Sequence, residues 1–399
     1  MRRRVLATLL VLFGLAAVLV ATLRPVYGTG GTSGDLNFPR TYQEFLYHDI
    51  FRNVLLFAPF GAGMAARGMR AVVALPLGVG VSGSVELAQR QIPGRNAGLH
   101  DVASNGVGTL LGFALLQILP GWLRPTRAVR RRLVLGAGAG AAVVFLATSW
   151  LFQPFLVDTR WAGSWAPRLW YRGQYGGRVL SSSIDGVALT QDSYANLSAV
   201  REHFRGNFTL ELELQAGKPP EKAAPLFLLT GTSHVHLIEL SVRGEDLLLG
   251  FQNRGKRMGF QTAQLYAFGA LQGVTPGEEL RLTLERRDAE YCFDVAERRS
   301  CGHGFTVGDA WKFFLAPTAE RVRGWGSGLA SAWVALVCLP LGLWGRREAC
   351  SGAACAVTLA GLLCAPLFGG VLATPLLQIA AVGIGVGAGA VLRRVFRVG

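Results

Sequence analysis

Long apolar runs cover most of the chain, and a region with a different pattern interrupts them after the fifth run. The apolar runs are residues 5–23, 51–66, 71–87, 102–119, 133–152, 329–344, 350–368 and 373–392. A helix that spans a bilayer needs about 17 to 25 such residues. The pattern therefore predicts eight transmembrane helices and excludes a simple soluble protein. A cleaved signal peptide is the alternative for the first run, but no small-residue cleavage motif follows it, so retention is favoured.

The interrupting region, from about residue 161 to 317, alternates apolar and polar residues over short distances. This period of two is the signature of half-buried strands. The candidate strands are residues 208–214, 237–242, 247–251 and 280–285. Turn signals containing Gly or Pro separate them, as in an antiparallel sandwich of the immunoglobulin or jelly-roll kind. We favour a jelly roll.

The distribution of charge predicts how the chain is oriented in the membrane. The chain has 40 Lys plus Arg against 25 Asp plus Glu, a net charge of +15. With a cytoplasmic N-terminus, the inner loops and termini hold 15 of the basic residues and the outer short loops hold 5. Because basic loops stay inside, both termini are expected in the cytoplasm. The excess charge is then a topology signal that attracts anionic lipid, and a nucleic-acid partner is excluded.

These patterns divide the chain into three segments. Residues 1–153 are expected to form a five-helix transmembrane bundle, residues 154–325 an extracytoplasmic β-sandwich, and residues 326–399 three further transmembrane helices. The fold class is a polytopic α-helical membrane protein, N-in and C-in, with an all-β jelly-roll domain outside. The expected location is the inner cell membrane.

Two cysteines in the β region point to the same compartment. Cys292 and Cys301 bracket a candidate hairpin turn at Ala296 and Glu297. Opposed positions on adjacent strands lie at the separation that a disulfide requires. A disulfide implies an oxidising compartment, in agreement with the charge argument. Two unpaired buried thiols are the alternative.

Polar residues gather at the outer ends of the second, third and fourth apolar runs. The members are Asn53, Glu86, Gln89, Arg95, Asp101 and Asn105. Ionisable groups in a membrane are costly, and spacings of three or four residues place them on one face of each helix. Gly108 and Gly112 form a stripe of small residues that allows close helix packing. We expect a polar pocket in which Arg95 neutralises Glu86 or Asp101; a purely structural network is an equal alternative.

The same residues resemble the VanZ-like family over about residues 23–119. The resemblance rests on residues 53–61, 84–89, 95 and 101–112. It implies a small helical membrane domain, linked in some members to teicoplanin-type glycopeptide resistance. The positions carried over are Asn53, Pro59, Gly61, Glu86, Gln89, Arg95, Asp101 and Asn105. The large outer region and the last three helices extend beyond the family pattern.

A looser resemblance concerns the β region. Residues 204–212, 280–286 and 291–295 resemble the laminin-G/concanavalin-like superfamily of lectins and glucanases. This resemblance implies glycan binding on the concave sheet but transfers no ligand residue. A structural spacer is the alternative.

Three functions are compatible with this organisation. The first is a non-enzymatic envelope protein that holds a lectin-like domain over the membrane and organises surface glycans or lipid-linked precursors. The second is a membrane enzyme acting on a lipid-linked glycan, with Glu86 or Asp101 as general base and Arg95 binding phosphate. A transporter is disfavoured, because the ionisable groups lie at one edge of the membrane. No metal or cofactor is expected, and the residues favour the non-enzymatic protein.

Overall fold

The structure is a computed structural model that describes residues 2–23, 47–92, 97–156, 161–169, 172–190, 197–231, 236–315, 319–346 and 349–395. The chain divides into two compact units. The first comprises Met1–Val129, Gly259–Gln261 and Arg394–Gly399, and the second comprises Arg130–Met258 and Thr262–Arg393.

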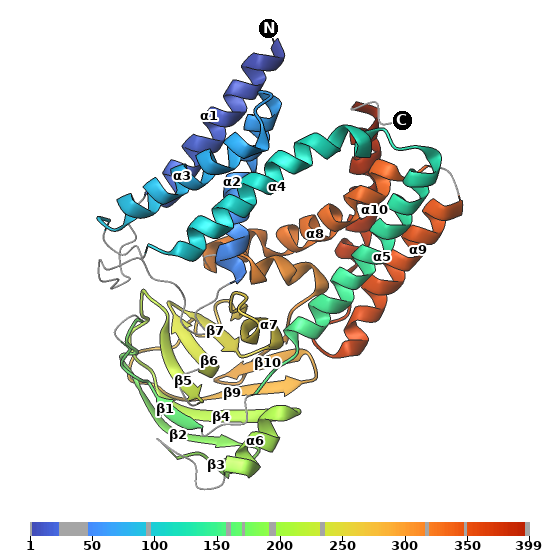
Figure 1. Cartoon of the computed structure of the whole chain (residues 1–399). Helices are drawn as coiled ribbons and strands as arrows, with labels where there is room; N and C mark the ends of the chain where they lie inside the picture. The colour runs from blue at the N-terminus through green and yellow to red at the C-terminus, as the bar shows by residue number, and fades with distance from the viewer. Residues whose placement is uncertain are drawn as a thin grey trace. The chain divides into compact units, whose positions relative to one another are not determined.

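The first unit is built from four helices, which contain the first four apolar runs (Figure 1). They are α1 (Arg2–Thr22), α2 (Tyr47–Ala66), α3 (Ala71–Gln89) and α4 (Leu99–Leu123). Their shared core contains Phe57 and Phe60 of α2, Val18 of α1 and Phe113 of α4. The helix α2 continues through Pro59, which lacks the amide hydrogen for an intrahelical bond.

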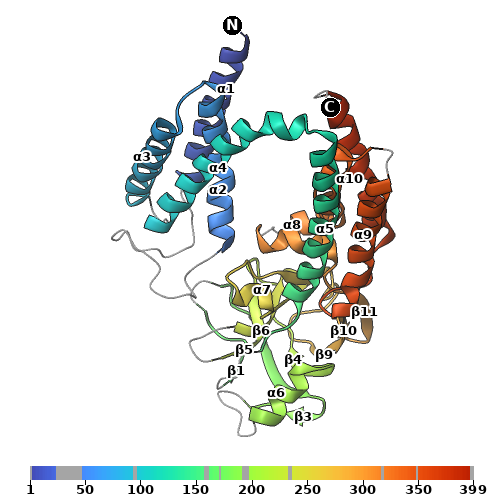
Figure 2. The same cartoon turned by 45° about the vertical axis from the view of Figure 1, so that its right-hand side comes forward.

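The helices of the second unit contain the other four apolar runs. They are α5 (Arg127–Phe152), which begins at the unit boundary, α8 (Ala319–Trp344), α9 (Ala349–Cys364) and α10 (Leu376–Val395) (Figure 2). Gly138 of α5 lies against Ala354 of α9, and Gly385 of α10 lies against Ala335 of α8, with no room for a Cβ at either glycine. Small residues at these positions let the helix backbones approach closely.

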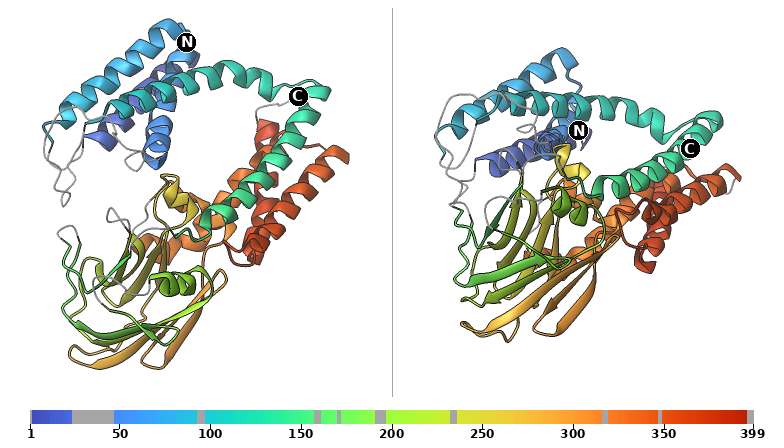
Figure 3. Two further views of the ribbon diagram at one scale, coloured as in Figure 1. Left: turned by 60° about the horizontal axis from the view of Figure 1, so that its bottom comes forward. Right: turned by 90° about the horizontal axis from the view of Figure 1, so that it is seen from below.

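Two antiparallel sheets form the β region of the second unit (Figure 3). The five-stranded sheet has the order β1-β5-β6-β7-β8, and the six-stranded sheet has the order β11-β10-β9-β4-β2-β3. The strands are β1 (Ala162–Trp165), β2 (Arg178–Ile184), β3 (Val187–Ala188), β4 (Phe208–Gln215), β5 (Ala224–Thr230), β6 (His236–Arg243), β7 (Asp246–Phe251), β8 (Gln264–Ala267), β9 (Glu279–Arg287), β10 (Glu290–Val295) and β11 (Arg298–His303). Two short helices, α6 (Leu197–Arg205) and α7 (Arg254–Arg257), lie between strands. The predicted β-sandwich is confirmed; its jelly-roll and laminin-G-like character stay predictions.

The alternating residues of the sandwich are buried as the pattern predicts. Leu210 and Leu212 of β4 pair with Leu284 and Leu282 of β9, and all four are fully buried. Successive residues of a strand point to opposite faces, so their polar neighbours point away from the core. The four strands predicted from the sequence are all present.

The hairpin of β10 and β11 carries the predicted disulfide. Ala296 and Glu297 have positive φ angles of 48° and 68° and form the turn between Val295 and Arg298. This turn matches the natural twist of paired strands. Cys292 and Cys301 are bonded across the hairpin, with their Cα atoms 4.1 Å apart.

A 3₁₀ helix, η3 (Val307–Phe313), joins the sandwich to the helices of the same unit. The ring of Phe152, at the end of α5, stacks on the rings of Phe305 and Phe313, both with centroids 4.3 Å away. Gln378 of α10 donates to the hydroxyl of Thr306 at 2.6 Å and accepts from the amide of Gly308 at 3.1 Å. Aromatic packing and buried hydrogen bonds therefore fix the sandwich to its helices.

Five helices of the described chain are long and apolar enough to cross a membrane. They are Ala71–Gln89, Arg127–Phe152, Val322–Trp344, Ala349–Phe368 and Leu376–Val395. A shorter apolar helix covers Ala7–Thr22. Membrane-type helices combined with an all-β region are thus confirmed, whereas the count of eight spans and the position of both termini stay predictions.

Candidate functional site

The buried carboxylate of Glu86 binds the start of α4. Its Oε2 accepts a hydrogen bond of 2.9 Å from the amide of Gly98, and the residue is 3% exposed. The carbonyl of Gly98 accepts from the amide of Asp101 in the first turn of α4. Amide groups at a helix N-terminus carry a partial positive charge, and both carboxylates lie beside this end of α4.

Asp101 is bound to α2 through Asn53. The Nδ2 of Asn53 lies 2.5 Å from Oδ1 of Asp101 and 3.3 Å from Oγ of Ser104. His100 lies 3.4 Å from the same oxygen of Asp101. These contacts join the second turn of α2 to the start of α4.

Two further amides extend the polar contacts to α3 and α1. Asn105 of α4 donates to the hydroxyl of Ser82 on α3 at 2.8 Å, and both residues are buried. Gln89 of α3 donates to the carbonyl of Thr22 on α1 at 3.1 Å. A hydrogen-bonded network of side chains therefore links all four helices of the first unit, at positions that the sequence singled out.

Glycines bring α2 and α4 close enough for this network. A Cβ added to Gly61 would collide with the carbonyl of Thr109, and one added to Gly112 would collide with the carbonyl of Ala58. Gly108 lies against the carbonyl of Val54 in the same way. Side chains larger than hydrogen are excluded along this contact, which continues over about two turns of α2.

Of the predicted cluster, the structure joins Asn53 with Asp101 and places Glu86 beside Gly98, the residue before α4. Asn105 and Gln89 each bind a different neighbouring helix. Arg95 lies outside the described residues, so its pairing with Glu86 or Asp101 stays a prediction. The described contacts can hold two carboxylates in place and bind the helices together.

A second polar cluster lies in the sandwich, and the sequence reasoning missed it. Glu239 of β6 is 6% exposed, and its carboxylate is 2.9 Å from Nδ1 of His236 and 2.9 Å from Oγ of Ser241. The guanidinium of Arg172 lies 3.2 Å from the same carboxylate. The alternation of residues 237–242 places Glu239 and Ser241 on one face of the predicted strand. This pattern could have identified the pair from the sequence. No sequence pattern connects Arg172 with this strand.

The electrostatics of this cluster favour a charged glutamate. Burial by itself raises the pKa of the Glu239 carboxyl, but hydrogen bonds from His236 and Ser241 and the charge of Arg172 outweigh burial, and the pKa lies below its ordinary value. The side chains of His236 and Arg172 are 28% and 29% exposed. A buried anion thus holds two partly exposed donors at the surface of the sheet.

Potential metal ligands meet at one place in the described ranges. Glu290, Cys292 and Cys301 lie close enough together to share an ion. Because the two sulfurs are bonded to each other, neither is a thiolate that could bind a metal. This group is therefore a disulfide with a neighbouring carboxylate.

Comparison with known proteins identifies the first unit. Residues 7–120 match the model of the VanZ/LLP1 family. The match includes α2, α3, most of α1 and α4, and the polar network described above. No curated protein and no solved structure matches the chain. The match to a membrane-protein family agrees with the apolar helices. Residues 7–120 are therefore a VanZ/LLP1-family domain, within a longer chain that also carries a β-sandwich.

Proposed function

We propose that this VanZ-like membrane protein presents its sandwich on the outer side of the inner cell membrane, where the sandwich binds surface glycans or lipid-linked envelope precursors. The protein acts as a non-enzymatic organiser of the envelope. Through these ligands it affects glycopeptide susceptibility of the teicoplanin type.

The outward position is supported by the Cys292–Cys301 disulfide, because such bonds persist in oxidising compartments. The arginine-rich loops, which are expected inside, support it independently. The disulfide lies in the second unit, whose η3 helix and α5 connect the sandwich directly to apolar helices.

The observation that carries glycan binding is the cluster around Glu239. Sugar hydroxyls are bound by polar side chains held in fixed positions, and Glu239 fixes His236 and Arg172 while leaving both partly exposed. Burying a carboxylate costs free energy, and packing between strands does not require one. A binding role therefore accounts better for Glu239.

Surface labelling tests the outward position. In a chain whose four free cysteines are replaced by alanine, Lys218→Cys in the sandwich should react with a membrane-impermeant maleimide in intact cells. Arg346→Cys, in an expected inner loop, is the matched control and should react only after permeabilisation. Protection of Lys218→Cys in intact cells would overturn the proposal.

Glycan binding is tested with the full chain in detergent on an array of envelope glycans. His236→Ala and Arg172→Ala should each weaken binding, whereas Arg281→Ala, on the exposed face of the other sheet, should not. Equal binding by all four proteins, or no binding by the wild type, would contradict the role of the cluster. Teicoplanin susceptibility of cells that lack the protein gives the physiological readout.

A second candidate is a membrane enzyme acting on a lipid-linked glycan. It is favoured by the placement of Glu86 and Asp101 at the same end of α4, where one could serve as general base and Arg95 could bind phosphate. Glu86→Gln and Asp101→Asn should then change the envelope glycans without loss of the inserted protein. Unchanged glycans in both variants would exclude catalysis by these residues.

A further inference from the structure

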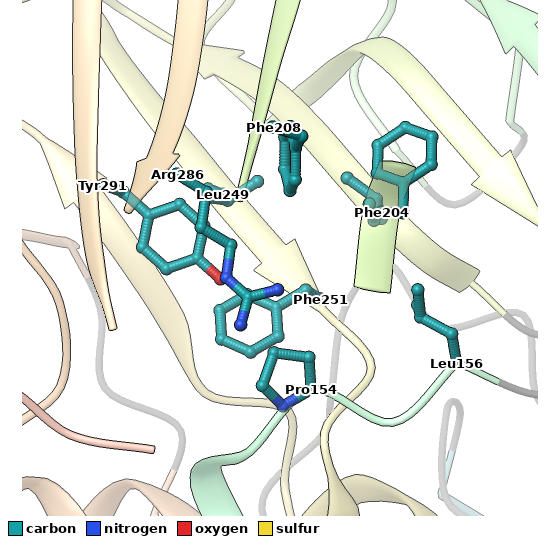
Figure 4. Close-up of a pocket in the computed structure, with 9 residues that line it drawn as sticks. Pro154, Leu156, Phe204, Phe208, Leu249, Phe251, Arg286 and Tyr291 are labelled. Atoms are coloured by element: carbon teal, nitrogen blue, oxygen red, sulfur yellow. The ribbon is translucent and has the colours of Figure 1, made fainter. Parts of the chain in front are cut away.

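The short helix α7 is attached to the end of α5, a helix apolar enough to cross a membrane. The backbone amide of Arg254 donates to the carbonyl of Gln153 at 3.0 Å. Pro154 pairs with Asn253 and lines the same small cavity as Phe251, the last residue of β7 (Figure 4). The segment after α5 therefore holds α7 beside the point where α5 ends (Figure 2).

A second apolar helix ends at the same level. The side-chain amide of Gln153 donates to the carbonyl of Phe368, where the apolar helix Ala349–Phe368 ends. Gly370, two residues further on, lies against the carbonyl of Ser149 in the last turn of α5, with no room for a Cβ. Two neighbouring helices that are apolar enough to cross a membrane thus end together. Because such segments end where the hydrocarbon layer ends, we expect a membrane surface at this level.

Exposed aromatic and apolar side chains lie at the same level. Trp150 of α5 is 41% exposed, and Leu367 and Phe368 of the 3₁₀ turn η4 (Ala365–Phe368) are 83% and 48% exposed. Aromatic residues such as tryptophan concentrate where a membrane meets water. Covering a leucine as exposed as Leu367 with lipid is favourable. These side chains are therefore those expected at a membrane surface.

Three cations of α7, Arg254, Lys256 and Arg257, lie next to aromatic side chains of this region. The guanidinium of Arg254 lies 4.8 Å from the centre of the Trp150 ring, and that of Arg257 lies 4.5 Å from the centre of the Phe155 ring. A guanidinium stacked on a ring keeps its in-plane N–H groups for other partners. Within the described ranges, none of the three side chains has a hydrogen-bond or carboxylate partner.

We propose that α7 binds the phosphate groups of anionic lipids at the membrane surface where α5 ends, with Trp150 and Phe155 at the boundary of the headgroup layer. Charge complementarity identifies the partner, because three cations without carboxylate partners are held at the end of a membrane-type helix, where lipid phosphates lie. Guanidinium groups form strong hydrogen bonds with phosphate. The proposal rests on the proposed membrane location and does not depend on glycan binding at the Glu239 cluster.

The first test uses the full chain in lipid nanodiscs and measures whether α7 lies in the headgroup layer. With the four free cysteines replaced by alanine, Met258→Cys, directly after α7, carries a nitroxide label. A lipid with a nickel-chelating headgroup should enhance the relaxation of this label, because the metal lies at the level of the headgroups.

Lys218→Cys is the matched control for the label. Phe208, at the start of β4, lines the same cavity as Pro154, whereas Lys218 follows the other end of the strand. The seven residue steps from Phe208 to Gln215 correspond to about 23 Å. The label at Lys218→Cys should therefore respond much less to the nickel lipid than the label at Met258→Cys.

The second test measures amide hydrogen exchange of α7 in nanodiscs of phosphatidylcholine with and without phosphatidylglycerol. Phosphatidylglycerol should slow exchange in α7 of the wild type by at least about fivefold, which corresponds to one Lys or Arg at an anionic membrane surface. Combined replacement of the three cations, Arg254→Gln, Lys256→Gln and Arg257→Gln, should abolish this difference. Arg254→Lys with Arg257→Lys keeps the charges and should retain most of it.

A control variant removes the same number of charges at the other end of the six-stranded sheet. It combines Arg178→Gln, Arg281→Gln and Arg298→Gln, whose side chains are exposed. Charges this far from the membrane are screened in salt with a Debye length of about 8 Å. The control variant should therefore show the same effect of phosphatidylglycerol on α7 as the wild type.

Three results would overturn the proposal. The first is an equal response of Met258→Cys and Lys218→Cys to the nickel lipid. The second is exchange in α7 that phosphatidylglycerol does not slow, or slows equally in the wild type and the triple glutamine variant. The third is equal slowing by inorganic phosphate in phosphatidylcholine alone, which would assign the cations to a free anion.

Two features keep the test decisive. Should the triple glutamine variant fail to fold, Lys256→Gln changes one exposed side chain and should lose part of the effect of phosphatidylglycerol; full retention would contradict the proposal. In nanodiscs the result is independent of which side of the membrane the sandwich occupies in the cell. Failure here is therefore distinguishable from failure of the outward position, which surface labelling of intact cells tests.

Discussion

The VanZ-like helices and the sandwich satisfy their buried polar groups in different ways. In the helices, neutral amides and hydroxyls make most of the contacts, as Asn105 does with Ser82 and Gln89 with the carbonyl of Thr22. In the sandwich, strand pairing satisfies the backbone, and the buried side chains of interest are fully charged. One of them, Glu239 of β6, has several partners. The other, Arg286 of β9, is 8% exposed and has a single hydrogen bond among the described residues.

The difference shows how much stability a single substitution should cost in each region. The bonds between neutral groups, such as those of Asn105 and Gln89, are consistent with a structural role, because each bond is modest and the helices are held by close packing. A buried charge has a much larger cost when it is unpaired. Loss of one bond in the helices should therefore cost less than loss of a partner of Glu239, which would leave a buried charge incompletely paired.

The largest loss of stability is expected from a substitution at the contact between α2 and α4. Gly112→Leu should prevent the approach of α4 to the carbonyl of Ala58 and lower the free energy of unfolding by about 3 kcal/mol or more. Thermal unfolding in detergent measures this. Gly80→Leu on α3 is the control, because nothing lies within 4 Å of a Cβ at that glycine. Equal stability of the two variants would mean that close packing does not hold these helices.

Removal of the disulfide should cause the next largest loss of stability, and this loss should be confined to the sandwich. Cys292→Ser together with Cys301→Ser opens a loop with a sequence separation of 9 residues. The chain-entropy model gives a loss of about 2 to 3 kcal/mol for a loop of this size. Chemical denaturation with and without reductant measures it. The double variant should be insensitive to reductant, and a wild type equally insensitive would contradict a stabilising disulfide.

Glu239→Gln should destabilise the sandwich by about 2 kcal/mol, since it leaves Arg172 and His236 beside a neutral group. The estimate is at the lower end for a buried pair because both partners remain partly hydrated. Ser241→Ala, which removes one neutral hydrogen bond from the same carboxylate, is the milder control. A Glu239→Gln variant as stable as the wild type would show that the ion pair contributes no net stability.

The pH dependence of stability gives a separate test of the same group. Because the pKa of Glu239 is lowered in the folded protein, the unfolded chain takes up this proton first as the pH falls below the ordinary value of 4.5. The stabilisation is therefore complete above that pH and is lost as the pH falls through the folded pKa. Denaturation midpoints measured between about pH 6 and pH 3 should fall less steeply for Glu239→Gln than for the wild type.

Much of the fold could be predicted from the sequence, because it depends on local periodicity. The alternation of residues 208–214 and 280–285 identified β4 and β9, and the positions of Cys292 and Cys301 identified a disulfide. The sites were harder to predict. Glu239 meets Arg172 across 67 residues of sequence, a pairing that follows only from the arrangement of the strands.

The smallest expected effect concerns the hydrogen bonds between helices. Ser82→Ala should cost about 1 kcal/mol, because it removes the partner of a buried amide on Asn105. Ser84→Ala on the same helix is the control, since the Ser84 hydroxyl is exposed and donates to the carbonyl of Gly80 within α3 itself. Thermal unfolding of both variants in detergent decides whether the buried bond matters. If Ser82→Ala matches Ser84→Ala, the bond between Asn105 and Ser82 adds nothing to the association of α3 with α4.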